Sequence, residues 1–139
     1  MNYLVDTNVL SEAVKKKPDS KVVRWLQQHE SQLYVSVISI AEIRRGIELL
    51  SDGKKKRSLL IWLESLCDIL KGRMLHFNLE TAHLWGELKA YWEKQGVAIP
   101  SLDAQIAATA KQHCLTLVTR NVKDFERTGL LLLNPFQNL

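Results

Sequence analysis

Short apolar runs typical of β-strands alternate along this chain with longer helical patterns. The run Leu33–Val37 is rich in β-branched and aromatic residues, and further strands are expected at 4–5, 74–77, 115–119 and 130–133. Between them, apolar residues recur at helical spacing, most plainly over 55–70. Strands that alternate with helices form βαβ units, which build a sheet covered by helices on both faces. The sequence therefore predicts an α/β fold, a three-layer α/β/α sandwich with a central, mostly parallel sheet of five strands.

Capping and stop signals between the strands predict where the helices begin and end. Ser39 is expected to open a helix that runs through Leu50, and Asn78 to cap one that runs through Lys94. Further helices are expected at 7–14, from 19 or 20 onward, at 55–70, at 102–113 and at 122–127. No repeat or linker interrupts this pattern, so we expect one domain over 1–139.

The composition excludes several classes of protein. Hydrophobic residues make up 46% of the 139 residues and charged residues 24%, which is typical of a globular domain and not of a disordered chain. No uncharged stretch approaches the roughly 20 residues that span a bilayer, and Asp6 interrupts any signal-peptide core. We therefore expect a cytoplasmic protein with no membrane partner. The net charge of +4 permits a nucleic-acid or acidic-protein partner without requiring one.

The two cysteines, Cys67 and Cys114, lack the spacing of a zinc or redox site. Each lies among apolar residues, so both are expected to be small core residues.

Acidic side chains follow the predicted strands, at the edge where ligands bind in parallel sheets. Asp6 ends the first strand, and Glu42 and Asp103 are expected in the first turns of helices. Asn121 and Asp124 follow the fourth strand. Two carboxylates about 4.5 Å apart repel by roughly 3 to 4 kcal/mol, so a cluster needs bound protons or a cation. Carboxylate oxygens suit Mg²⁺ or Mn²⁺, whose natural chemistry here is phosphodiester hydrolysis by an activated water.

Each of these acids also has a purely structural interpretation. Ser39 and Glu42 fit a capping box, and Asp103 could simply favour the N-terminus of its helix. Asp124 could cap a short helix or pair with a neighbouring cation. Asp6 is harder to explain in this way, because it directly follows a buried strand.

Four motifs, in order along the chain, resemble those of the PIN-domain family. The closest likeness is to its VapC toxins of type II toxin–antitoxin modules, including the FitB-like branch, and it covers essentially the whole chain. The motifs are Val5-Asp6-Thr7-Asn8, Ile40-Ala41-Glu42-Ile43 with Arg44-Arg45-Gly46, Asp103-Ala104-Gln105-Ile106-Ala107-Ala108-Thr109-Ala110, and Val118-Thr119-Arg120-Asn121 with Asp124-Phe125.

The resemblance implies a Mg²⁺- or Mn²⁺-dependent endoribonuclease with Asp6 and Asp103 as principal metal ligands. Glu42 would be the third acid, binding the metal directly or through water. Many members place a fourth catalytic acid just after the fourth strand. Here Asn121 occupies the best-matching position and Asp124 lies three residues further on, so either could fill that place.

The polar residues Thr7, Asn8, Thr119 and Asn121 would line the site. In the expected reaction, a metal-bound water attacks the RNA phosphorus, and the resemblance implies a 5′-phosphate and a 3′-hydroxyl as products. The resemblance also implies a homodimer and a VapB-like antitoxin that blocks cleavage. It further implies that the toxin–antitoxin complex binds operator DNA through the antitoxin.

Basic residues near the predicted acids are candidates for contact with RNA or with an acidic antitoxin segment. Arg44 and Arg45 lie about one turn from Glu42, and Arg120 follows the fourth strand. A polyanion needs such counter-charges beside an acidic centre.

Two other functions fit parts of the sequence. The stretch Asp6-Thr7-Asn8-Val9-Leu10 is one residue away from the start of haloacid-dehalogenase-type phosphatases, but Asn8 cannot act as an acid. An aspartyl-phosphate formed from a phosphate monoester would identify that class. A non-catalytic module that binds antitoxin or nucleic acid is the other alternative, and a metal titration would distinguish it.

Overall fold

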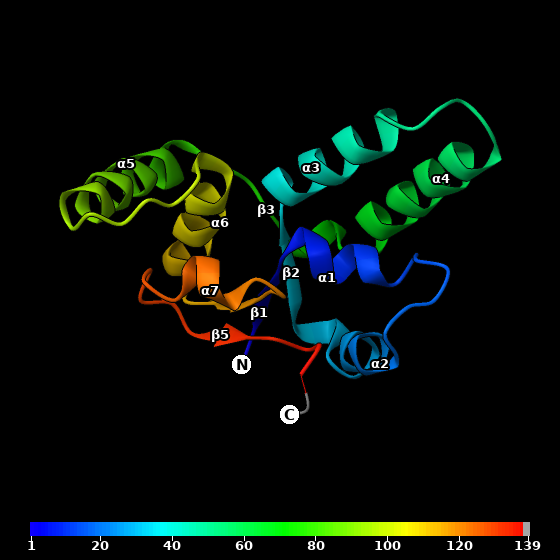
Figure 1. Cartoon of the computed structure of the whole chain (residues 1–139), viewed down its shortest axis with the longest axis horizontal. Coiled ribbons are helices and arrows are strands. Elements are labelled where there is room, and N and C mark those ends of the chain that lie inside the picture. Colours follow the sequence, from blue (N-terminus) through cyan, green and yellow to red (C-terminus); the bar gives the residue numbers. More distant parts are fainter. Residues whose placement is uncertain (138–139) are drawn as a thin grey trace.

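Five short strands form one central sheet in the order β3-β2-β1-β4-β5 (Figure 1). All four strand pairings are parallel, as the alternation of strands and helices predicts. The computed structural model describes residues 1–137. Within them the strands are β1 (Tyr3–Val5), β2 (Leu33–Ser36), β3 (Met74–Leu75), β4 (Thr116–Val118) and β5 (Leu132–Leu133).

Helices join each strand to the next. The two longest, α4 and α5, have 16 residues each, and no helix in the described residues is long and apolar enough to cross a membrane. The α-helices are α1 (Thr7–Glu12), α2 (Ser20–Gln28), α3 (Val37–Glu48), α4 (Lys54–Ile69), α5 (Leu79–Lys94), α6 (Ser101–Gln112) and α7 (Val122–Phe125), with 3₁₀ turns at Glu30–Gln32 and Lys71–Arg73.

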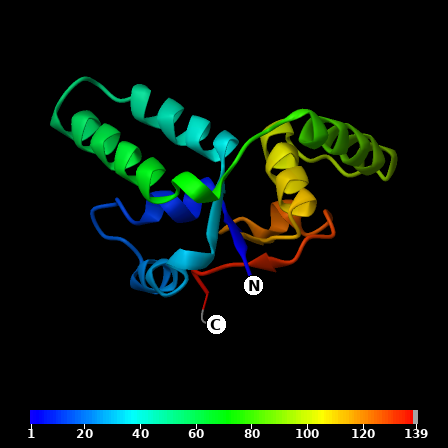
Figure 2. The same cartoon turned by 180° about the vertical axis from the view of Figure 1, so that it is seen from behind.

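Alternate residues of the central strand face two separate hydrophobic clusters. Tyr3 and Val5 pack with residues of α1, α2, α3 and α4, whereas Leu4 packs with residues of α5, α6 and α7. Seen from behind, the α3–α4 and α5–α6 pairs lie to opposite sides of the sheet (Figure 2). The sheet therefore lies between two helical layers, and the predicted α/β/α sandwich is confirmed.

The start of α3 differs from the prediction. Ser36, not Ser39, is the N-cap: its backbone is extended and its hydroxyl accepts a hydrogen bond from the Ile38 N–H at 3.0 Å. The helix begins at Val37 because the chain turns directly after β2, so Glu42 lies in the second turn. The predicted capping box between Ser39 and Glu42 is therefore wrong.

The prediction for Cys114 is also wrong. This residue is exposed and has a φ of 54°, because it lies in the left-handed turn that ends α6. Cys67 is partly buried and packs against the cluster on the α1–α4 side.

β1 is the first strand of the chain and lies at the centre of the sheet, with two strands on each side. From β1 the chain builds β2 and β3 on one side, then crosses to β4 and β5 on the other. In open parallel sheets, this switch point leaves a crevice at the carboxyl ends of the strands, where ligands bind. Asp6 and Thr119 follow the two strands that meet there.

Candidate active site

Asp6 occupies the switch point between β1 and β4. Its backbone N–H donates to the Val118 carbonyl at 2.9 Å, and its extended backbone makes it the N-cap of α1. The side chain accepts hydrogen bonds from the Thr7 N–H at 2.9 Å and from the Thr119 hydroxyl at 2.8 Å. The residue is only 6% exposed. A carboxylate is thus held rigidly at the end of two buried strands.

Asn8 and Thr119 complete the support of this carboxylate. The Asn8 amide donates to Oδ2 of Asp6 at 3.4 Å, and its carbonyl oxygen accepts from the Arg120 N–H at 3.0 Å. The Thr119 hydroxyl also accepts from the Asn121 N–H at 3.1 Å. Two loops far apart in sequence are therefore joined around Asp6, and Thr7, Asn8 and Thr119 lie where the sequence predicts them. Asn121 takes part through its backbone N–H.

Glu42 reaches the same region from α3. Its Oε1 accepts a hydrogen bond from the Thr7 hydroxyl at 3.3 Å, while the Thr7 N–H binds Asp6. Burial, followed by the charge of Asp6, raises the pKa of Glu42, and the Thr7 hydrogen bond and Arg45 oppose this change. Thr7 therefore connects the first two acids of the site.

Asp103 lies in the first turn of α6, and the charges of the other three acids raise its pKa. Burial raises its pKa to about 6, with further contributions from Asp6, Asp124 and Glu42. Burial also raises the pKa of Asp6, an effect that its hydrogen bonds oppose and the charge of Asp124 reinforces. The charges of Asp6, Glu42 and Asp124 thus all act on Asp103, although the four acids come from the end of β1, from α3, from α7 and from α6.

The chemistry of these donors fits a hard divalent cation. They are carboxylates supported by hydroxyl and amide groups, and three of them have pKa values raised partly by one another's charges. A cation between them would relieve that repulsion. Within residues 1–137, no group of three or more His, Cys, Asp or Glu side chains has an arrangement that could hold a metal ion as it stands.

The three predicted arginines have different surroundings. Arg45 is exposed and its charge lowers the pKa of Glu42, so it belongs to the site. The Arg44 Nε donates to Oε2 of Glu48 at 2.7 Å, one turn along the helix. The Arg120 guanidinium lies 4.5 Å from the centre of the Phe136 ring.

Sequence reasoning did not find a cavity next to Asp124. The loop that joins α5 to α6 and helix α7 line it, and Arg127 is among its residues. Asp124 lies in α7 and Arg127 in the turn that follows it, so no helical spacing in the sequence indicated that both line the cavity.

Comparison with known proteins identifies the family. The model of the PIN domain matches residues 3–131 of the 139. The chain belongs to the PIN-domain family. The PIN relatives include "Toxin FitB" of Neisseria gonorrhoeae, which is 39% identical over 97% of this chain and 99% of that protein. They also include "VapC ribonuclease Y4jK" of Sinorhizobium fredii, which is 36% identical over 96% of this chain and 97% of that protein.

A solved PIN structure has nearly the same fold. The crystal structure of FitAcB from Neisseria gonorrhoeae superposes with a TM-score of 0.92 at 38% identity, and the match covers 98% of this chain and 99% of that one. The PIN fold predicted from the four motifs is thereby confirmed.

Proposed function

We propose that this chain is the toxic component of a type II toxin–antitoxin module and acts as a metal-dependent endoribonuclease. One observation supports the proposal most: the charges of Asp6, Asp124 and Glu42, which are remote from Asp103 in sequence, all raise its pKa, and Asp6 lies at the switch point of a parallel sheet. The relatives named as a toxin and as a VapC ribonuclease support the same activity.

Asp6, Asp103 and Glu42 would hold Mg²⁺, or Mn²⁺ in its place, with Asp124 as the fourth catalytic acid. When bound, such an ion activates water and stabilises negative charge on a phosphate. Part of the rise in the pKa values of Asp6 and Asp103 comes from neighbouring carboxylate charges, and a cation bound among them would relieve that repulsion and stabilise the ionised forms.

The other polar residues would position these acids and the substrate. The hydrogen bonds from Thr119 and Asn8 lower the pKa of Asp6, against the effect of its burial, and fix the direction of its carboxylate. Thr7 holds Glu42 beside it. Arg45 would attract the RNA phosphates that the carboxylates repel.

Regulation would come from a cognate VapB-like antitoxin that covers the acidic site and contacts Arg44, Arg45 or Arg120. We further propose a homodimer, and a toxin–antitoxin complex that binds operator DNA through the antitoxin. The resemblance to VapC toxins supports these assignments.

The activity is tested by RNA cleavage in the presence of Mg²⁺ and in EDTA. We expect cleavage with Mg²⁺ alone, giving 5′-phosphate ends. Asp6→Asn and Asp103→Asn each remove a ligand, so the rate should fall by about 100-fold or more, since a metal supplies several kcal/mol of stabilisation. Asp68→Asn, at an exposed position on α4, is the matched control and should cleave at the wild-type rate.

Two results would contradict the proposal. Equal cleavage in EDTA would exclude metal-dependent chemistry. RNA binding without cleavage under all metal conditions would instead identify a non-catalytic nucleic-acid-binding module.

A further inference from the structure

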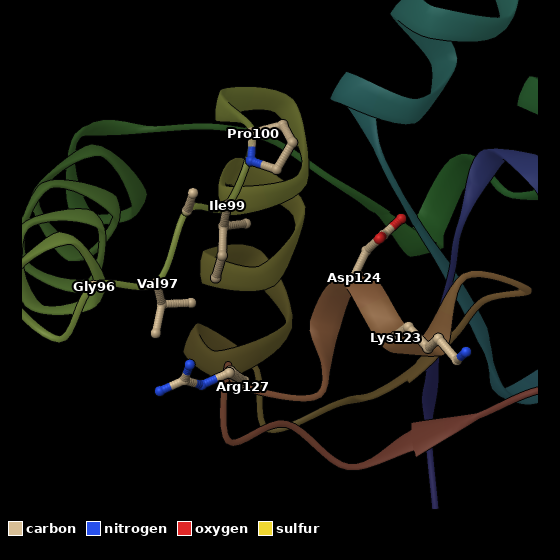
Figure 3. Close-up of a pocket in the computed structure, with 8 residues that line it drawn as sticks. Gly96, Val97, Ile99, Pro100, Lys123, Asp124 and Arg127 are labelled. Atoms are coloured by element: carbon tan, nitrogen blue, oxygen red, sulfur yellow. The ribbon is translucent and has the colours of Figure 1, made fainter.

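A cavity of about 240 Å³ lies between the loop that joins α5 to α6 and helix α7 (Figure 3). Val97 and Pro100 provide its apolar wall, with the almost completely buried Ile99 between them in the chain, and Asp124 and Arg127 line it from the other side. The cavity is smaller than the roughly 300–1,000 Å³ of sites for drug-sized ligands. It therefore suits one small group and not a larger molecule.

The apolar wall is held in place by contacts to α5. Gly96 has a φ of 74°, which turns the chain sharply at the end of that helix, and the Val97 N–H then donates to the Trp92 carbonyl at 2.8 Å. The ammonium group of Lys89 donates to the Ile99 carbonyl, and Ile99 itself is only 2% exposed. A ligand would thus meet a preformed surface, which reduces the entropy cost of binding.

Asp124 links the cavity to the acidic site, because it lines the cavity and its charge acts on Asp6 and Asp103. The charge of Asp124 raises the pKa values of Asp6 and Asp103, so all three carboxylates are within electrostatic reach. Figure 3 shows Asp124 and Arg127 on different sides of the α7 segment, with Arg127 beneath Val97. Lys123 also lines the cavity, but its ammonium group extends away from the loop (Figure 3).

We propose that this cavity is a nucleotide subsite, which receives the base of the RNA nucleotide next to the cleaved phosphodiester while Arg127 contacts its phosphate. The inference rests on the proposed nuclease function and names the part of the chain that positions its substrate. An apolar wall beside a single accessible guanidinium matches the two halves of a nucleotide, a base with an apolar face and an anionic phosphate. Phosphate contacts fix the register of a bound strand, so Arg127 would determine which bond lies over the carboxylates.

Binding to a fluorescein-labelled single-stranded RNA of mixed sequence, measured by anisotropy in EDTA, tests the subsite without cleavage. Arg127→Ala should weaken binding about 3- to 10-fold, and should reduce the slope of log affinity against log salt by about 0.7, the loss expected for one phosphate contact. Arg24→Ala removes the same charge from an exposed position on α2 and is the matched control, with affinity and slope close to wild type.

A second variant tests the apolar half of the subsite. Ala98 lines the cavity and is exposed, so Ala98→Trp should fill it without disturbing the core. We expect weaker RNA binding and, with Mg²⁺, a changed pattern of cleavage sites. Gln95→Trp adds the same bulk at a neighbouring exposed position outside the cavity and should change neither.

The failure of the subsite and the failure of the nuclease proposal give different results. If the wild-type chain cleaves RNA and the variants Arg127→Ala and Ala98→Trp bind RNA as tightly as their controls, the subsite is wrong and the nuclease proposal stands. If the wild-type chain neither binds nor cleaves RNA, both are wrong.

Discussion

Asp6 is a buried carboxylate whose ionised form depends on its hydrogen bonds. Burial raises its pKa, and the Thr119 hydroxyl is the strongest of the contacts that lower it again. Thr119 is completely buried and bonds Asp6 at 2.8 Å, so it is well placed to set both the charge and the direction of that carboxylate. We regard Thr119 as a positioning residue.

Thr119→Val keeps the shape of the side chain and removes its hydroxyl. The Asp6 carboxylate and the Asn121 N–H then lose a partner, so the free energy of unfolding should fall by about 1–2 kcal/mol. Mg²⁺ affinity should fall about 10-fold, as is typical when a partner of a ligand is lost. Calorimetric Mg²⁺ titration and urea unfolding measure the two effects. Thr119→Ser should restore metal affinity, and an unchanged affinity in Thr119→Val would show that the hydroxyl does not position Asp6.

Arg45 and Arg44 offer a matched comparison of adjacent charges. Arg45→Gln should raise the pKa of Glu42 further, because the charge of Arg45 holds it down. Arg44→Gln should leave that pKa unchanged, because the Arg44 guanidinium pairs with Glu48. Carboxyl ¹³C shifts followed through a pH titration measure both values. Equal changes in the pKa of Glu42 in the two variants would contradict this prediction, because both arginines would then act equally on Glu42.

Individual residues differed in how far the sequence could predict them. Asp6 was predictable because a carboxylate directly after a buried strand must lie at the ligand-binding edge of the sheet. The different roles of Arg44 and Arg45 follow from their spacing once both lie in one helix, because Arg45 is three residues from Glu42 and Arg44 is two residues from Glu42 but four from Glu48.

At the scale of elements, α3 depends on how its first turn is capped. The Ser36 hydroxyl accepts from the Ile38 N–H, whereas the buried Ser39 hydroxyl has no hydrogen-bond partner within residues 1–137. The sequence favoured Ser39, because the β-branched Val37 after Ser36 fits a continuation of the strand. What decides between them is where β2 stops, which depends on its pairing with β1 and β3.

Replacing each serine with alanine separates the two possibilities. Ser36→Ala should lower the free energy of unfolding by about 1 kcal/mol, the usual cost of losing an N-cap. Ser39→Ala should not lower the free energy of unfolding and should raise it, because the buried Ser39 hydroxyl loses its hydration on folding and gains no hydrogen bond in return. Urea denaturation of both variants is the measurement. A larger loss for Ser39→Ala would restore the capping box predicted from the sequence.

At the scale of the whole molecule, the fold was more predictable than the site. Alternating strand and helix patterns are enough to require a parallel sheet with two helical layers, and the residues of β1 divide between the two clusters as expected. The cavity beside α7 was missed because its wall is a loop without periodicity, positioned by contacts to α5 that no local pattern encodes.

The stability of the whole chain should depend on pH through Asp103. In the folded chain the pKa of Asp103 is raised from 3.8 to about 6. The protonated carboxyl therefore makes its full contribution to the stability of the fold below pH 3.8, and this contribution is lost as the pH rises through 6. Without metal, the Tm of Asp103→Asn minus the Tm of wild type should therefore increase as the pH rises from 4 to 7. Adding Mg²⁺ should raise the wild-type Tm more at pH 7 than at pH 5, because the ion binds the ionised form.

Thermal unfolding followed by dye fluorescence checks this dependence. Asp68→Asn serves again as the control and should follow the wild-type curve. A Tm difference between wild type and Asp103→Asn that does not vary with pH would mean that Asp103 is ionised as easily as an exposed aspartate.

The bond between Asp6 and Thr119 joins the beginning of the chain to its last fifth. During synthesis, the ribosome must therefore complete the chain through the end of β4 before Asp6 and Thr119 can come together. Products that terminate earlier carry Asp6 without its partner strand and should be harmless to the cell that makes them. Two fragments divided at an exposed loop, each inert alone, offer a way to switch the activity on by bringing them together.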